Sequence, residues 1–85
     1  MDNDQILALI REALVEVAPK KKADFENITM DTNIEALGLD SIATMEMVNF
    51  VEERIDATFA DEELAKVQTI RDLAGLVKGG RVSAG

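Results

Sequence analysis

Hydrophobic residues recur at helical spacing near the start of the chain. From about Asp4 to Val17 they follow one another at steps of four, four and three residues, which places them on one face of a helix. Asp2, Asn3 or Asp4 can cap this helix, and Pro19 marks its end because proline lacks the N–H that would continue the hydrogen-bond ladder. The stripe consists of Ile6, Ile10, Leu14 and Val17.

A second helix is predicted from Ser41 to Ile55 or Asp56. One of its faces carries the residues expected to pack on the core. Ile42 points almost opposite to that face and Met45 lies at its edge, so we expect both hydrophobic side chains to be exposed. The core face consists of Thr44, Met47, Val48, Val51 and Ile55, and the far side of Glu46, Asn49 and Glu53.

Two more helices are predicted near the end of the chain. Asp61 can cap a short helix that extends through Leu64 and Ala65. Thr69 and Asp72 form a typical capping pair for the last helix. The apolar stripe of that helix is Ile70, Leu73, Ala74 and Val77, and Gly79-Gly80 ends it.

The segment 18–40 is much longer than an ordinary connection between helices. Hydrophobic residues are spaced through it as anchors, so we expect a packed loop with a short helical turn over Thr32–Leu37. Lys20, Lys21 and Lys22 are interpreted as a solvated cluster near the end of the first helix. The anchors are Phe25, Ile28, Met30, Ile34, Leu37 and Leu39.

These patterns predict an all-α fold, a small helical bundle of three main helices plus one short helix, with a long first loop. A chain of 85 residues is large enough for one modest core. We therefore expect a single domain over residues 1–78 and a flexible C-terminal tail over residues 79–85.

Composition excludes several classes of function. The chain contains no Cys and no His, so it lacks disulfides, thiolate ligands and an imidazole base. Seventeen acidic and nine basic residues give a net charge of −8, which argues against nucleic-acid binding and favours basic protein partners and a monomer. No apolar run approaches the roughly 20 residues of a membrane span, and the acidic N-terminus is unlike a secretory signal. We therefore expect a cytoplasmic protein without membrane contact.

Ser41 is the residue with the clearest chemical potential. It follows a glycine-containing turn and opens the second helix, where unpaired N–H groups and the helix dipole would stabilise a covalently attached phosphate. The alternative is that Ser41, or Asp40 before it, only caps the helix. A catalytic serine without His would need a lysine held against it, and none is near in sequence. The sequence therefore favours a protein that is not an enzyme.

Two other functions compete with this interpretation. Asp31, Asn33 and Glu35 alternate as in a calcium loop, but the sixth position is Ala36 where glycine is needed and the twelfth is Ile42 where glutamate is needed. An acidic helical protein–protein interaction module without a prosthetic group stays open as the alternative function.

Five residues carry a family resemblance. Gly38-Leu39-Asp40-Ser41-Ile42 is similar to the Gly-x-Asp-Ser-Leu signature of acyl carrier proteins, and with the length, acidity and long first loop the chain resembles that family over roughly residues 4–78. The resemblance implies that a phosphopantetheinyl transferase attaches 4′-phosphopantetheine from coenzyme A to Ser41, with magnesium, and that Asp40 helps to present the hydroxyl. The prosthetic arm would supply the thiol that the chain lacks and carry acyl or aminoacyl groups as thioesters.

The resemblance also implies partner surfaces. Acyl- or aminoacyl-loading ligases and acyl-transferring enzymes with basic patches would dock on one group of residues, and another group would shelter the acyl chain. Ala43 and Asn49 depart from the pattern of the housekeeping fatty-acid carriers, so a specialised carrier is expected. The docking residues are Ile42, Met45, Glu46, Glu52 and Glu53, and the acyl pocket residues are Val48, Phe50, Val51 and Ile70.

Overall fold

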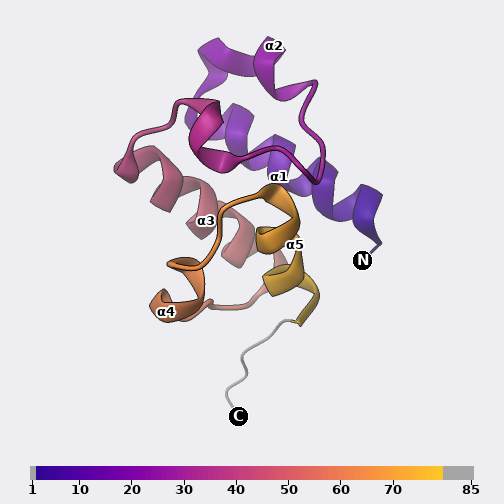
Figure 1. Ribbon diagram of the computed structural model, residues 1–85, viewed down its shortest axis with the longest axis vertical. Coiled ribbons are helices and arrows are strands. Elements are labelled where there is room, and N and C mark those ends of the chain that lie inside the picture. The colour runs from indigo at the N-terminus through magenta and orange to yellow at the C-terminus, as the bar shows by residue number, and fades with distance from the viewer. Residues whose placement is uncertain (1, 80–85) are drawn as a thin grey trace.

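The computed structural model describes residues 2–79 and is all-helical, as predicted (Figure 1). Three long helices form the body of the bundle, and two four-residue helices lie at its opposite ends (Figure 1). The predicted three main helices and one short helix are therefore confirmed, with one more short helix in the first loop. The elements are α1 (Asn3–Val17), η1 (Pro19–Lys21), α2 (Lys22–Phe25), η2 (Ile34–Leu37), α3 (Ser41–Ile55), α4 (Asp61–Leu64) and α5 (Ile70–Gly79), where η denotes a 3₁₀ turn.

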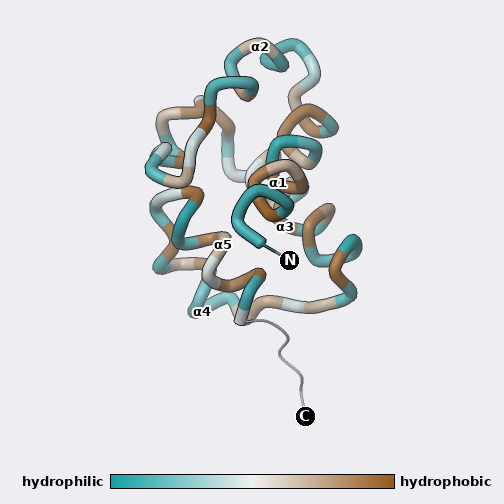
Figure 2. Tube along the Cα trace, turned by 90° about the vertical axis from the view of Figure 1, so that its right-hand side faces the viewer, coloured by the Kyte–Doolittle hydropathy of each residue, from teal (hydrophilic) through white to brown (hydrophobic). Residues whose placement is uncertain are grey.

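The core lies where the three long helices meet. Each carries hydrophobic and hydrophilic residues along its length (Figure 2), and each contributes hydrophobic residues to the buried core. Every buried residue of the described chain is hydrophobic, so burial costs no uncompensated charge. The core residues are Ile6, Leu9, Ile10, Ala13, Leu14, Phe25, Ile28, Met47, Val48, Val51, Phe59, Ile70, Leu73, Ala74 and Val77.

Local backbone and side-chain features fix where α1 begins and where α3 ends. Asp2 accepts a hydrogen bond from the Gln5 N–H at 2.8 Å, and the Gln5 side chain accepts one from the Asp2 N–H at 3.0 Å, which completes a capping box. Among the three predicted candidates for this cap, Asp2 is therefore the one used. α3 ends at Ile55, as predicted, because Asp56 adopts a left-handed conformation with φ of 56°.

The long first loop is ordered and packed. Phe25 is fully buried and Ile28 is 5% exposed, and the other four predicted anchors pack against the core. The expected helical turn is confirmed as η2. α2 was not predicted, because a four-residue helix with one buried side chain is too short to show periodicity.

Backbone hydrogen bonds join this loop to the start of α5. The Ile34 N–H donates to the Gln68 carbonyl at 2.9 Å, and the Arg71 N–H donates to the Met30 carbonyl at 2.8 Å. Ile70 donates in the same way to Thr32 at 2.9 Å. These bonds pair peptide groups of the half-buried loop and attach the loop to α5.

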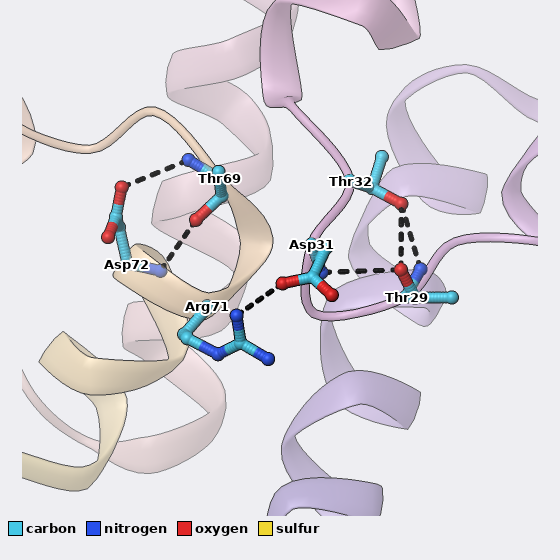
Figure 3. A network of polar contacts seen from close by, with 6 residues as sticks. All are labelled: Thr29, Asp31, Thr32, Thr69, Arg71 and Asp72. Atoms are coloured by element: carbon cyan, nitrogen blue, oxygen red, sulfur yellow. Dashed lines mark hydrogen bonds and ion pairs between the residues drawn. The ribbon is translucent and has the colours of Figure 1, made fainter.

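Side chains reinforce the same junction (Figure 3). Arg71 forms an ion pair with Asp31 of the loop. The predicted capping pair is confirmed, because the Thr69 N–H donates to the Asp72 carboxylate at 3.1 Å and the Asp72 N–H donates to the Thr69 hydroxyl at 3.2 Å (Figure 3). Hydrogen bonds from the backbone N–H groups of Gln68 and Thr69 stabilise the ionised form and lower the pKa of Asp72 below its ordinary value of 3.8.

The structure corrects three details of the sequence interpretation. Asp61 is the first residue of α4, and the cap position is taken by Ala60 without a side-chain hydrogen bond. Lys21 is not part of a freely solvated cluster, because its ammonium group donates to the carbonyl oxygen atoms of Leu37 and Gly38. Gly79 is helical, so α5 enters the expected tail over residues 79–85, and the rest of that tail lies outside the described residues. Within residues 2–79, no helix is long and apolar enough to cross a membrane.

Candidate functional site

Ser41 occupies the first helical position of α3 and is exposed to solvent. Asp40, not Ser41, caps the helix: its carboxylate accepts a hydrogen bond from the Ala43 N–H at 2.7 Å. The Asp40 carbonyl accepts two more bonds from Thr44, from its N–H at 3.0 Å and its hydroxyl at 2.9 Å. The structure thus decides between the two predicted caps and leaves the Ser41 hydroxyl without a capping role.

The first turn of α3 leaves backbone donors available beside Ser41. Capping by Asp40 occupies the N–H of Ala43, whereas the N–H groups of Ser41 and Ile42 form no hydrogen bond with another residue of the described chain. Two free amides at the positive end of a 15-residue helix form a favourable environment for an anion. A phosphodiester attached to the Ser41 hydroxyl oxygen would carry a negative charge at this end of the helix.

The turn before Asp40 is held by two unusual features. Gly38 has φ of 76°, a left-handed conformation that glycine adopts without steric cost. The Lys21 Nζ donates to the Leu37 carbonyl at 3.2 Å and to the Gly38 carbonyl at 3.3 Å. The first loop thus supports the turn from which Ser41 projects.

Sequence reasoning missed this role of Lys21, because sixteen and seventeen residues separate it from its two acceptors. The contact also bears on catalysis by Ser41. Folding does bring a lysine to the motif, but its ammonium protons are directed at backbone carbonyls. An amine that acts as a hydrogen-bond donor in this way is not a base for the serine.

The predicted docking residues lie on the exposed side of α3, with one exception. Ile42 is 72% exposed and Met45 46% exposed, which confirms the predicted exposure, and Glu46 and Glu53 are exposed with them. Glu52 is half-buried, and its carboxylate accepts a hydrogen bond from the Phe59 N–H at 2.7 Å. Glu52 therefore holds the connection between α3 and α4.

The four residues predicted to shelter an acyl chain do not share one environment. Val48 is 5% exposed, Val51 and Ile70 are fully buried, and all three belong to the core. Phe50 is half-buried and lines a surface groove between α1 and α3. Because Val48 and Phe50 are two residues apart, they lie about 160° apart around the helix axis.

The residues that resemble a calcium loop are engaged in structural contacts. Asp31 pairs with Arg71, and Asn33 caps η2 by accepting the Glu35 N–H at 2.8 Å. Among residues 2–79, no three acidic side chains are grouped so that they could hold a metal ion.

Comparison with known families defines the class of protein first. The family model described as "Phosphopantetheine attachment site" matches residues 5–77, which is most of the chain. The prosthetic group of this class is phosphopantetheine. The structure fits such a group, because an exposed serine opens α3 beside two free amides and the chain has no Cys of its own to carry a thioester.

Similar proteins narrow the class further. An acyl carrier protein of an Exiguobacterium species is 35% identical over 79 residues, which cover 92% of this chain and 96% of that protein. The actinorhodin polyketide synthase acyl carrier protein of Streptomyces coelicolor is 33% identical over 76 residues, which cover 88% of each chain. The chain belongs to the acyl carrier protein family. Members of this family are modified by a phosphopantetheinyl transferase and act with partner enzymes. No solved structure matches the chain.

Proposed function

We propose that this protein carries acyl intermediates as thioesters on a 4′-phosphopantetheine arm attached to Ser41. The observation that supports Ser41 most directly is its exposed position at the start of α3, beside the free amides of Ser41 and Ile42. When bound, the group supplies a terminal thiol. The chain supplies the anchor for it and the surface that partners recognise.

During attachment, the Ser41 Oγ forms a bond to the phosphorus atom of the pantetheine phosphate in coenzyme A. The hydroxyl proton passes to a base of the transferase, and the remainder of coenzyme A leaves as adenosine 3′,5′-bisphosphate. Asp40 caps α3 directly before Ser41, and its carboxylate would help to present the hydroxyl, and the magnesium used by the transferase, during transfer. Lys21 and Gly38 hold the turn that precedes Asp40 and Ser41.

The protein acts as a carrier and not as a catalyst. It has no histidine or cysteine, and Lys21, which contacts the turn before Asp40, donates to carbonyl groups. A thioester on the arm is therefore formed and consumed by the loading and transferring enzymes that dock on this protein.

Docking is proposed on the exposed side of α3, through Ile42, Met45, Glu46 and Glu53. Two exposed hydrophobic side chains next to carboxylates can contact an apolar spot with a basic rim on a partner. Charge attraction between such surfaces accelerates association and weakens with salt, which suits a carrier that visits several enzymes in turn. We leave Glu52 out of this surface because its carboxylate accepts a hydrogen bond from the Phe59 N–H.

The cargo is proposed to be that of a specialised pathway. Ala43 lies on α3 at a position that is usually acidic in housekeeping fatty-acid carriers, and Asn49 at one that is often apolar. One similar protein is named for polyketide synthesis. Fatty acyl, aminoacyl and polyketide groups all fit a thioester carrier. An acyl chain that enters the bundle would displace core contacts of Val48, Val51 and Ile70, since these side chains are buried.

Intact mass spectrometry tests the attachment. Incubation with coenzyme A, magnesium and a broad-specificity phosphopantetheinyl transferase should add one phosphopantetheine to the wild-type protein. Ser41→Ala should stay unmodified while its helical circular dichroism is unchanged. A wild-type mass that does not shift with several transferases would refute the proposal and favour an interaction module without a prosthetic group.

A further inference from the structure

Three consecutive lysines follow α1, and only the middle one is half-buried. Lys20 and Lys22 are exposed, and within the described chain no ion pair or side-chain hydrogen bond engages either of them. The ammonium group of Lys21 instead donates to the Leu37 carbonyl at 3.2 Å and to the Gly38 carbonyl at 3.3 Å. The middle lysine therefore makes a specific contact that its two neighbours of equal charge lack.

The turn formed by residues 37–39 depends on this contact for its position. The side chains of Leu37 and Leu39 pack against the core, but Gly38 between them has no side chain that could anchor it. In the described chain, the two bonds from Lys21 are the only hydrogen bonds that join this turn to a segment distant in sequence. Because glycine has the greatest backbone freedom of all residues, the turn would sample more conformations without Lys21.

The turn leads directly into the serine that is proposed to carry the prosthetic group. Ser41 lies three residues after Gly38, and the Asp40 cap begins α3 between them. Three residues span at most about 10 Å even when fully extended. A transferase that reaches the Ser41 hydroxyl therefore comes close to the turn.

We propose that Lys21 is a positioning residue for the modification of Ser41, because its ammonium group holds the turn in the conformation that the phosphopantetheinyl transferase binds. The inference rests on the proposed function. Lys21 donates to carbonyl groups of the turn and not to the Ser41 hydroxyl, so its effect falls on binding and not on the transfer step. When the conformation that binds is only partly populated, the apparent affinity falls by that fraction. Loss of the two bonds should therefore raise KM for this protein and leave kcat unchanged.

Steady-state kinetics of the transferase, at saturating coenzyme A and magnesium, test the inference with Lys21→Met. Its KM should rise about three- to tenfold, as expected for the loss of two hydrogen bonds to an otherwise mobile turn. Lys20→Met and Lys22→Met are matched controls, because they remove the same charge from exposed neighbours. Each of the three variants makes the protein more acidic, which by charge attraction to a basic partner leaves KM unchanged or lowers it. A rise in KM that is confined to Lys21→Met therefore has the opposite sign to the charge effect.

Backbone ¹⁵N relaxation of the unmodified protein gives a measurement that is independent of the transferase. The order parameters of Gly38 and Leu39 should fall from about 0.85 toward about 0.6 in Lys21→Met and stay unchanged in Lys20→Met. Both measurements are made at a temperature where circular dichroism shows that every variant is folded. An unchanged KM for Lys21→Met, equal rises in all three variants, a fall in kcat alone, or unchanged order parameters would overturn the inference.

Failure of this inference is distinguishable from failure of the proposed function. If the wild-type protein is modified and Lys21→Met has the same KM, only the role of Lys21 is refuted. If no transferase modifies the wild-type protein, the proposed function is refuted, and with it any role of Lys21 in modification, while the order parameters still report whether Lys21 holds the turn.

Discussion

Replacing Gly38 by alanine should destabilise the protein through two separate effects. The first is backbone strain, since alanine at φ of 76° costs about 1 kcal/mol or slightly more. The second is displacement of Lys21, because a Cβ atom at position 38 would lie 2.5 Å from the Lys21 Nζ. The ammonium group would move and lose its bonds to the Leu37 and Gly38 carbonyls, which are together worth about 1 kcal/mol. The expected total is about 2 kcal/mol.

A double-mutant cycle with Lys21→Met separates the two effects. Methionine is one atom shorter than lysine and ends near the position of the Lys21 Cε, which would lie 4.0 Å from the added Cβ atom, an ordinary contact distance. Lys21→Met alone should cost about 1 kcal/mol through the lost hydrogen bonds. In its background, Gly38→Ala should cost only the backbone strain, again about 1 kcal/mol.

Urea unfolding followed by circular dichroism measures all four proteins of the cycle. The double variant should be about 1 kcal/mol more stable than the sum of the single effects predicts. Additivity within about 0.5 kcal/mol would refute the reasoning, because it would mean that Lys21 keeps its carbonyl contacts when residue 38 has a side chain. Unequal m-values would instead point to a changed denatured state, so the comparison uses variants with a common slope.

Three further predictions concern other parts of the molecule. Asp40→Ala should destabilise the protein by about 1 kcal/mol in urea unfolding, whereas Asp40→Asn should retain the helix cap. Both variants should slow the modification of Ser41 if the Asp40 carboxylate helps to hold magnesium. Ile42→Ser should leave the free energy of unfolding within about 0.5 kcal/mol of the wild-type value, because Ile42 is 72% exposed. The same variant should lower kcat/KM of the transferase for this protein. An unchanged kcat/KM would remove Ile42 from the docking surface. The pKa of Asp72 is lower in the folded state, so its ionised form stabilises the fold above pH 3.8 and this contribution is lost as pH falls through the folded-state pKa. The stability difference between wild type and Asp72→Asn should therefore shrink as the pH falls below 3.8, and a constant difference would contradict the assigned hydrogen bonds.

The sequence predicted the features that periodicity and capping chemistry report. The stripes of α1, α3 and α5 indicate which side of each helix is buried, and the wheel position of Ile42 correctly predicted its exposure. The capping pair of Thr69 and Asp72 could be predicted from the sequence because the two residues bond to each other within one helical turn. These sequence patterns are local, so they can be interpreted without knowledge of the tertiary structure.

Contacts between distant segments were not predictable in this way. Nothing in the sequence near Lys21 indicates that its ammonium group meets the Leu37 and Gly38 carbonyls. Glu52 reads as one more exposed carboxylate until the chain turns and brings the Phe59 N–H to it. Phe50 was grouped with Val48 as a hydrophobic neighbour, although the two lie on different sides of α3. A helical pattern gives the direction of a side chain but not the partner that it meets.

The placement of the cations explains why the exposed side of α3 stays acidic. Within residues 2–79, four basic residues contact a distant segment of the fold: Arg11 with the Phe25 carbonyl, Lys21 with the turn before Asp40, Arg54 with Glu12, and Arg71 with Asp31. Each of these contacts joins two segments and so stabilises the bundle. None of the four places its charge on Glu46 or Glu53 in the described structure. The exposed side of α3 therefore keeps its negative charge for the docking proposed there, next to the serine proposed to carry the cargo.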